Sequence, residues 1–124
     1  MPFRFRLARI LKLREREEER RKQAFALCRR AELECQLAAQ EAEQEKRDVM
    51  VRLARREPGP VAVTSVLNAS RHLMGLTARL VRLALTKAER KKEREAAEMV
   101  YLEARRGRQA LEQLQERRRA AWTR

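Results

Sequence analysis

The chain has 124 residues and a formal net charge of +13, with 40% of its residues charged and 4% aromatic. Few Gly and Pro, together with abundant Ala, Leu, Glu, Arg and Lys, are typical of long helices or coiled coils and argue against a compact mixed fold. The length limits the chain to one domain at most. The predicted fold class is therefore all-α.

The first predicted helix starts near the N-terminus, because Pro2 suits a first turn and no Pro or Gly follows until a Glu-Pro-Gly-Pro run at residues 57–60. That run should end the helix, since proline lacks the amide hydrogen and restricts the residue before it. Thr64 or Ser65 can cap a second helix. We therefore predict a single antiparallel coiled-coil hairpin over residues 1–124: helix one over 3–56, a turn over 57–64 and helix two over 65–121.

Each predicted helix carries a stripe at the 3/4 spacing of a coiled-coil seam. On helix one the stripe consists of small residues: Ala24, Cys28, Ala31, Cys35, Ala38, Ala42 and Val49. On helix two the matching stripe is bulkier: Met74, Ala78, Val81, Leu85, Ala88, Met99 and Leu102. Small residues against larger ones allow close helix approach, so we predict that these stripes form one seam.

A short turn places residues opposite each other when their numbers add to roughly 120. This register predicts Leu7 and Leu11 opposite Leu111 and Leu114, with both termini at the open end. Residues 1–22 carry nine basic and four acidic side chains, and residues 105–124 carry seven and two. The open end is therefore expected to be strongly basic.

The sequence contains no pattern for catalysis or for a cofactor. It lacks phosphate-binding glycine loops and zinc-protease motifs, and His72 is its only histidine. A lone solvated or seam-edge histidine has no oriented partner for acid–base work. Cys28 and Cys35 are about 10 Å apart along a helix, too far for a disulfide, so free, buried thiols are expected. We predict no enzyme activity, no metal and no cofactor.

The N-terminal stretch is the most specific feature of the sequence. It runs Phe3-Arg4-Phe5-Arg6-Leu7-Ala8-Arg9-Ile10-Leu11-Lys12-Leu13-Arg14. This resembles the opening of the flagellar type III export protein FliJ family, a Phe-x-Phe-x-Leu-x-x-[Val/Ile]-Leu-x-[Leu/His]-Arg pattern that leads into a charged coiled coil. A closing Leu-Glu-x-Leu-x-Glu-Arg-Arg run at residues 111–118 is similar to the family in a more general way.

The resemblance implies a two-helix coiled coil, like the central stalk of rotary ATPases, that binds in the pore of the flagellar export ATPase ring and promotes its assembly. It also implies contacts with the cytoplasmic domain of the membrane export gate and with export chaperones. The chemistry would belong to the ATPase. A basic pole fits this expectation, because acidic side chains in a ring pore would favour its entry.

The residues expected to bind partners lie mainly at the open end, with apolar anchors and arginines together. They are Phe3, Phe5, Leu7, Ile10, Leu11, Arg14, Arg117, Arg118, Arg119 and Trp122. The alternative is that they close and solvate the end of the coiled coil. A second candidate surface could contact the export gate or could instead pack the closed end of the hairpin: Leu73, Leu76, Leu80 and Leu83.

Two other functional classes fit part of the pattern. The sequence pI near 11.2 would attract nucleic acid, but acidic residues interleave with basic ones and no reading motif is present, so such binding would be nonspecific. The second functional class is a structural stalk of another secretion or rotary ATPase machine, including the injectisome. Repeated arginines interrupt both the N-terminus and the most apolar window, residues 61–85, so we expect a cytoplasmic protein held at the inner membrane face through its partners.

Overall fold

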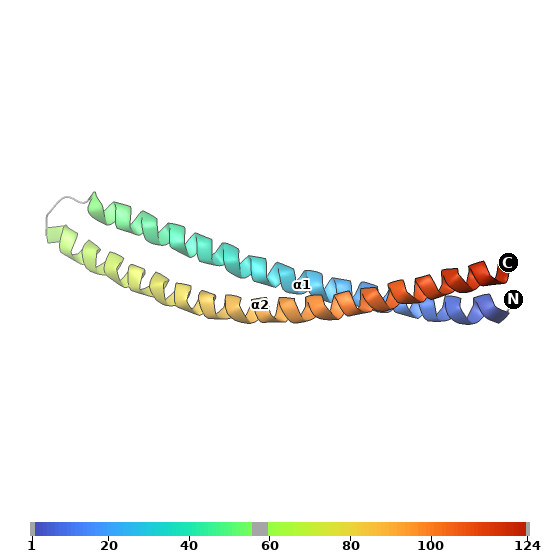
Figure 1. Cartoon of the computed structure of the whole chain (residues 1–124). Helices are drawn as coiled ribbons and strands as arrows, with labels where there is room; N and C mark the ends of the chain where they lie inside the picture. Colours follow the sequence, from blue (N-terminus) through green and yellow to red (C-terminus); the bar gives the residue numbers. More distant parts are fainter. Residues whose placement is uncertain (1, 56–59, 124) are drawn as a thin grey trace. The chain divides into compact units, whose positions relative to one another are not determined.

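The structure is a computed structural model that describes residues 2–55 and 60–123, with side chains described over residues 6–55 and 63–123. It contains helix α1 (Pro2–Ala54) and helix α2 (Pro60–Thr123), and no strand within the described residues (Figure 1). The two helices pack antiparallel on each other. The predicted all-α, two-helix hairpin is therefore confirmed.

The second helix begins earlier than predicted. We expected Thr64 or Ser65 to cap it, but both lie inside α2, which starts at Pro60. Proline is well suited to this position, because its fixed φ is already helical and its missing amide hydrogen would have no partner in the first turn. Thus Pro60 acts as a starting residue, although the sequence interpretation treated it as part of the turn.

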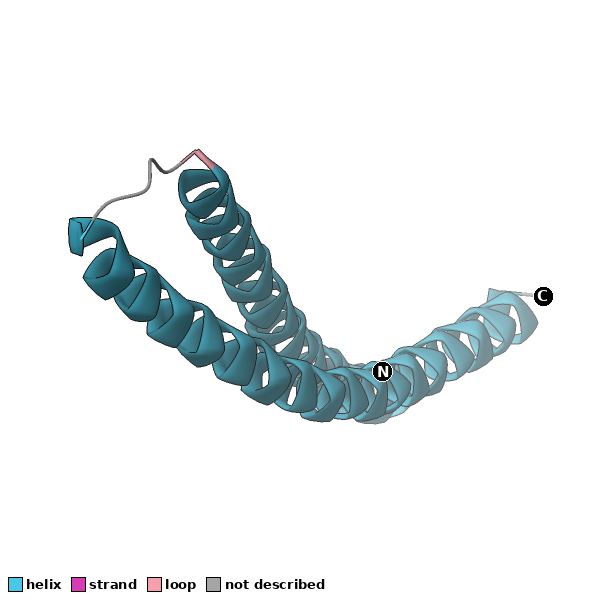
Figure 2. Cartoon of the chain, turned by 90° about the vertical axis from the view of Figure 1, so that its left-hand side faces the viewer, coloured by secondary structure: helices cyan, strands magenta, loops and turns pink. Residues whose placement is uncertain are grey.

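The chain divides into two compact units, and each contains a stretch of both helices. Unit 1 consists of residues 1–29 and 92–124, and unit 2 of residues 30–91. Figure 2 shows the helical stretches of α1 and α2 that belong to unit 2; α1 ends at Ala54 and α2 begins at Pro60. Each unit has its own seam, and the two seams differ in chemistry.

The seam of unit 2 is apolar, with small side chains from α1 facing leucines from α2. Ala42, Val49 and Leu76 are 1%, 4% and 6% exposed, which makes them the buried core of this unit. Cys35 is half-buried and carries a free thiol. The first-helix stripe predicted within this unit lies on the inner face, because its alanines and Cys35 let α2 approach closely.

The stripe predicted for the second helix is wrong. Met74, Val81, Leu85 and Met99 are 57–71% exposed, and Ala78 and Ala88 are exposed as well. Only Leu102 is half-buried. The inner face of α2 in unit 2 is instead made by four leucines: Leu73, Leu76, Leu80 and Leu83. Leucines in these inward positions remove large apolar side chains from water against the alanines of α1, which stabilises this register.

The seam of unit 1 combines apolar and charged residues. Leu7 is 7% exposed, and the ring of Phe25 stacks on the ring of Tyr101 with centroids 5.9 Å apart. Glu18 from α1 and Arg108 from α2 form a half-buried ion pair between these two apolar positions. Ala24, which we predicted in the seam, is exposed because the neighbouring Phe25 takes the inward position.

Candidate partner interface

Both termini belong to unit 1, and the N and C marks lie at the same end of it (Figure 1). Residues 1–22 and 105–124 together carry ten of the thirteen net positive charges of the chain. Contacts across the unit bring these segments together: Arg14 approaches Gly107, and Leu11 shares a shallow groove with Glu112, Gln115, Glu116 and Arg119. The expected basic end is thus present.

The predicted apolar anchors divide into inward and outward positions. Leu7 is buried and Leu11 is half-buried, so both pack the end of the coiled coil. Leu11 lies near Gln115 and Glu112, beside the positions predicted for its partners, Leu111 and Leu114. Ile10 is 38% exposed and Trp122 is 62% exposed, which leaves them on the surface. The backbones of Phe3 and Phe5 are in α1, but their side chains lie outside the described residues.

The predicted arginines all lie on the surface. Arg117, Arg118 and Arg119 are consecutive, so their side chains spread around the last turns of α2, and all three are exposed. Arg14 is exposed on α1, and its Nη1 lies 3.8 Å from the position that a Cβ atom at residue 107 would occupy. These four guanidinium groups are available to carboxylate groups of a partner.

The sequence analysis did not identify Arg108, which pairs with two carboxylates in unit 1, Glu18 across the seam and Glu112 on its own helix. Its Nε and Nη2 donate to the two carboxylate oxygens of Glu18, and its Nη1 lies 2.8 Å from Glu112 Oε1. Hydrogen bonds to Glu18 and then to Glu112 raise the pKa of Arg108 above its ordinary value. A heptad count could have found the pair, because Glu18 lies seven residues after Leu11 and seven before Phe25.

The four leucines considered for the export gate are not on an outer surface. Leu73, Leu80 and Leu83 are half-buried and Leu76 is buried, all in the seam of unit 2. Packing of the hairpin, the second of the two alternatives, accounts for their burial. Their side chains therefore pack against α1.

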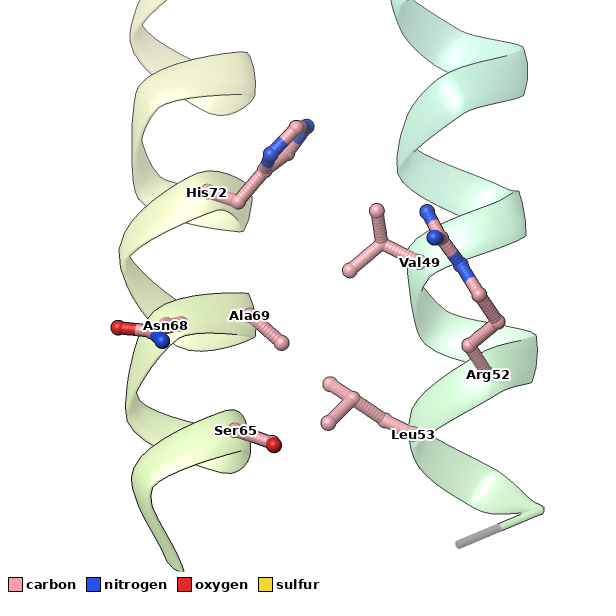
Figure 3. A pocket seen from close by; sticks show the side chains of 7 residues that line it. All are labelled: Val49, Arg52, Leu53, Ser65, Asn68, Ala69 and His72. Atoms are coloured by element: carbon pink, nitrogen blue, oxygen red, sulfur yellow. The ribbon is translucent and has the colours of Figure 1, made fainter. Parts of the chain in front are cut away.

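A groove of about 320 Å³ lies beside this seam in unit 2, where α1 and α2 separate. Its apolar floor comes from Val49, Leu53 and Ala69, and its rim is polar (Figure 3). His72 is at one edge, with its Nε2 2.9 Å from Glu45 Oε1, so it is the seam-edge histidine that the sequence indicated. Acid–base catalysis also needs a third group that orients such a pair, and the only hydrogen-bond contact of the His72 ring within the described residues is the one to Glu45.

The described residues hold no cluster of three or more His, Cys, Asp or Glu side chains that could bind a metal ion. Over residues 2–55 and 60–123, neither helix has a stretch long and apolar enough to cross a membrane. What the structure offers is therefore a set of exposed charged and apolar side chains on two long helices.

Comparison with known proteins identifies the family of the chain. No curated protein and no solved structure matches the chain. The family model described as "Flagellar FliJ protein" matches residues 3–124, nearly the whole length, including the Phe-x-Phe opening and the basic residues at 117–119. The chain therefore belongs to the flagellar FliJ protein family.

Proposed function

We propose that this chain, a flagellar type III export component by its family, is a non-enzymatic stalk that docks in the pore of the export ATPase ring and promotes its assembly. Contacts with the cytoplasmic domain of the export gate and with export chaperones complete the proposal, and would hold the chain at the inner face of the membrane. We place these contacts on side chains other than the four unit 2 leucines, which pack in the seam.

The basic end of unit 1 is the observation that carries the proposal. Its exposed basic side chains include Arg14, Arg117, Arg118 and Arg119. Trp122 and Ile10 add exposed apolar area at the same end. A ring pore with acidic walls would attract this end and orient it, because charge complementarity acts mainly on encounter and alignment. The aromatic and arginine side chains are also the types that most often anchor interfaces.

The test measures ATP hydrolysis and ring formation by the flagellar export ATPase of the same organism, with and without the chain. The main variant reverses three charges at the basic end, Arg117→Glu, Arg118→Glu and Arg119→Glu. The matched control makes the same change of net charge in unit 2, with Arg71→Glu, Arg79→Glu and Arg82→Glu. A third variant, Phe3→Ala with Phe5→Ala, tests the N-terminal motif.

We expect the wild-type chain and the unit 2 control to stimulate hydrolysis and ring formation equally. Reversal at residues 117–119 should weaken the stimulation by about tenfold, as expected for loss of charge complementarity. If both triple variants lose stimulation equally, net charge alone accounts for the effect. If no form of the chain changes rate or assembly, the ATPase stalk proposal is wrong.

A further inference from the structure

Helix α2 is apolar on two faces within unit 2. One face is the leucine seam packed on α1. The other, which we call the outer stripe, follows steps of three, four and seven residues along the helix, and each member is exposed: Val63, Leu67, Met74, Ala78, Val81 and Leu85. Side chains at this spacing share one helix face. A surface helix normally needs only one apolar face, so the outer stripe requires its own explanation.

The exposed fractions show how little of the outer stripe is covered. Met74 is 71% exposed, Leu85 65%, Val63 64% and Val81 57%. Monomeric soluble proteins seldom expose a contiguous row of large apolar side chains, and such rows commonly mark interaction sites. We propose that the outer stripe of α2 is a docking site for an amphipathic helix of a partner protein, with leucine-type side chains along its apolar face and acidic side chains beside them.

The charges of α2 beside the outer stripe indicate that the partner helix is acidic. Residues 61–88 contain no Asp or Glu but include Arg71, Arg79, Arg82 and Lys87, all of them exposed. Arg71 and Arg82 lie along one edge of the outer stripe, close to it by helical spacing. Glutamates next to the apolar face of a docked helix could therefore pair with these arginines, whereas lysines would be repelled.

The inner face of α2 packs against an α1 segment that is itself acidic. The α1 segment that packs on it in unit 2 contains six acidic and three basic residues between residues 30 and 48. One of these acids, Glu45, pairs with His72 across the seam. A second acidic helix on the opposite side would repeat the same chemistry and produce a three-helix arrangement, in which both apolar faces of α2 are covered.

Two other occupants fit less well. A second copy docked by the same stripe would bring Arg71 and Arg82 close to their own counterparts, and like charges across an interface are unfavourable. A membrane surface favours bulky and aromatic side chains, but residues 63–91 contain no Phe, Trp or Tyr, and the stripe includes Ala78. Alanine instead leaves room for the close approach of another helix.

The experiment titrates the full chain against a fluorescent synthetic helix of about 28 residues, with Leu at its a and d positions and Glu beside them. A second peptide has Lys in place of every Glu. The test variant places charges in the outer stripe, Met74→Glu with Val81→Glu. The matched control makes the same chemical change on the exposed face of α1 in the same unit, Leu33→Glu with Leu37→Glu, at residues 53% and 49% exposed.

We expect the acidic peptide to bind wild-type chain and control alike, and to bind the Met74/Val81 variant at least about tenfold more weakly. The Lys peptide should bind the wild-type chain at least about tenfold more weakly than the acidic one, and salt at about 0.5 M should weaken the acidic peptide. Circular dichroism should show equal helix content in all variants.

Three results would overturn the inference. Equal binding of the acidic peptide to both double variants would place its site elsewhere. A wild-type dimer that dissociates in the Met74/Val81 variant would make a second copy the occupant. Sedimentation with anionic phospholipid vesicles that depends on Met74 and Val81, without peptide binding, would make a membrane surface the occupant. The peptide titration contains no ATPase, so its failure would leave the stalk proposal untouched.

Discussion

Arg108 of α2 holds Glu18 of α1, 90 residues earlier in the chain, through hydrogen bonds from its Nε and Nη2 atoms. The side chains are 21% and 16% exposed, so water screens this ion pair less than the pair between Arg20 and Glu17, whose side chains are 75% and 35% exposed. The pair occupies a seam position where an apolar side chain would be expected. A polar group at such a position favours the register that satisfies it.

Removing the pair should therefore loosen unit 1. We expect Arg108→Gln to lower the thermal midpoint, because Glu18 would be left half-buried without its cation. Arg106→Gln, at an exposed position on the same helix, should change it little. In a double-mutant cycle, Glu18→Gln together with Arg108→Gln should lower the midpoint by less than the two separate losses added together. Strict additivity would mean that the two side chains do not act as a pair.

The same pair predicts a flat pH response at neutral and mildly basic pH. The pKa of Arg108 is raised above its ordinary value by its hydrogen bonds to Glu18 and then to Glu112. A raised pKa in the folded state gives stability that is complete below the unfolded pKa and lost only as pH rises through the folded one. The destabilisation caused by Arg108→Gln should thus stay constant from pH 7 to about pH 10.

Burial in unit 2 distinguishes the observed seam from the predicted one. Leu76→Ala removes a side chain that is 6% exposed, and we expect it to lower the free energy of unfolding by about 2–3 kcal/mol. Met74→Ala, two residues away and 71% exposed, should change it by less than about 0.5 kcal/mol. Urea denaturation followed by circular dichroism measures both. If Met74→Ala lowered the free energy of unfolding more than Leu76→Ala, the seam predicted from the sequence would be the correct one.

The hairpin itself could be predicted because its signals are local. Strong helix formers and the run of Pro and Gly at residues 58–60 determine two helices and one turn. The seam of α1 in unit 2 could also be predicted, since its small residues repeat on one face only. The seam of α2 could not, because that helix has two apolar faces and periodicity alone does not say which one meets α1.

The candidate site was predictable to a similar degree. The excess of arginine at both termini followed from simple counting, and antiparallel packing brought it into one unit. The inward turn of Leu7 and of Leu76 depends on side-chain packing across the seam, which sequence spacing does not determine. A search for apolar residues at heptad spacing also fails to find Glu18 and Arg108, because both are charged although they occupy seam positions.

Gly75 offers a way to strengthen the hairpin without altering the seam. It lies inside α2, and a Cβ added there would meet no atom within 4 Å. Gly75→Ala should raise the free energy of unfolding by up to about 1 kcal/mol, because alanine loses less backbone entropy in a helix. Gly107→Ala, whose Cβ would lie 3.8 Å from Arg14 Nη1, serves as the comparison and should stabilise to a similar extent. A loss of stability at Gly75 would indicate that the helix needs glycine there.

The stack of Phe25 on Tyr101 can be followed directly, because Tyr101 is the only tyrosine in the chain. The rings are inclined by 24°, and the guanidinium carbon of Arg29 lies 5.6 Å from the centroid of Phe25. Phe25→Leu keeps an apolar side chain in the seam but removes both ring interactions. We expect it to cost about 0.5–1.5 kcal/mol and to reduce the near-ultraviolet dichroism of Tyr101. Leu27→Ala, at a position 67% exposed, should leave the tyrosine signal unchanged. If the signal persists in Phe25→Leu, the environment of Tyr101 is fixed by other neighbours in unit 1, and the stack contributes packing area without a specific ring geometry.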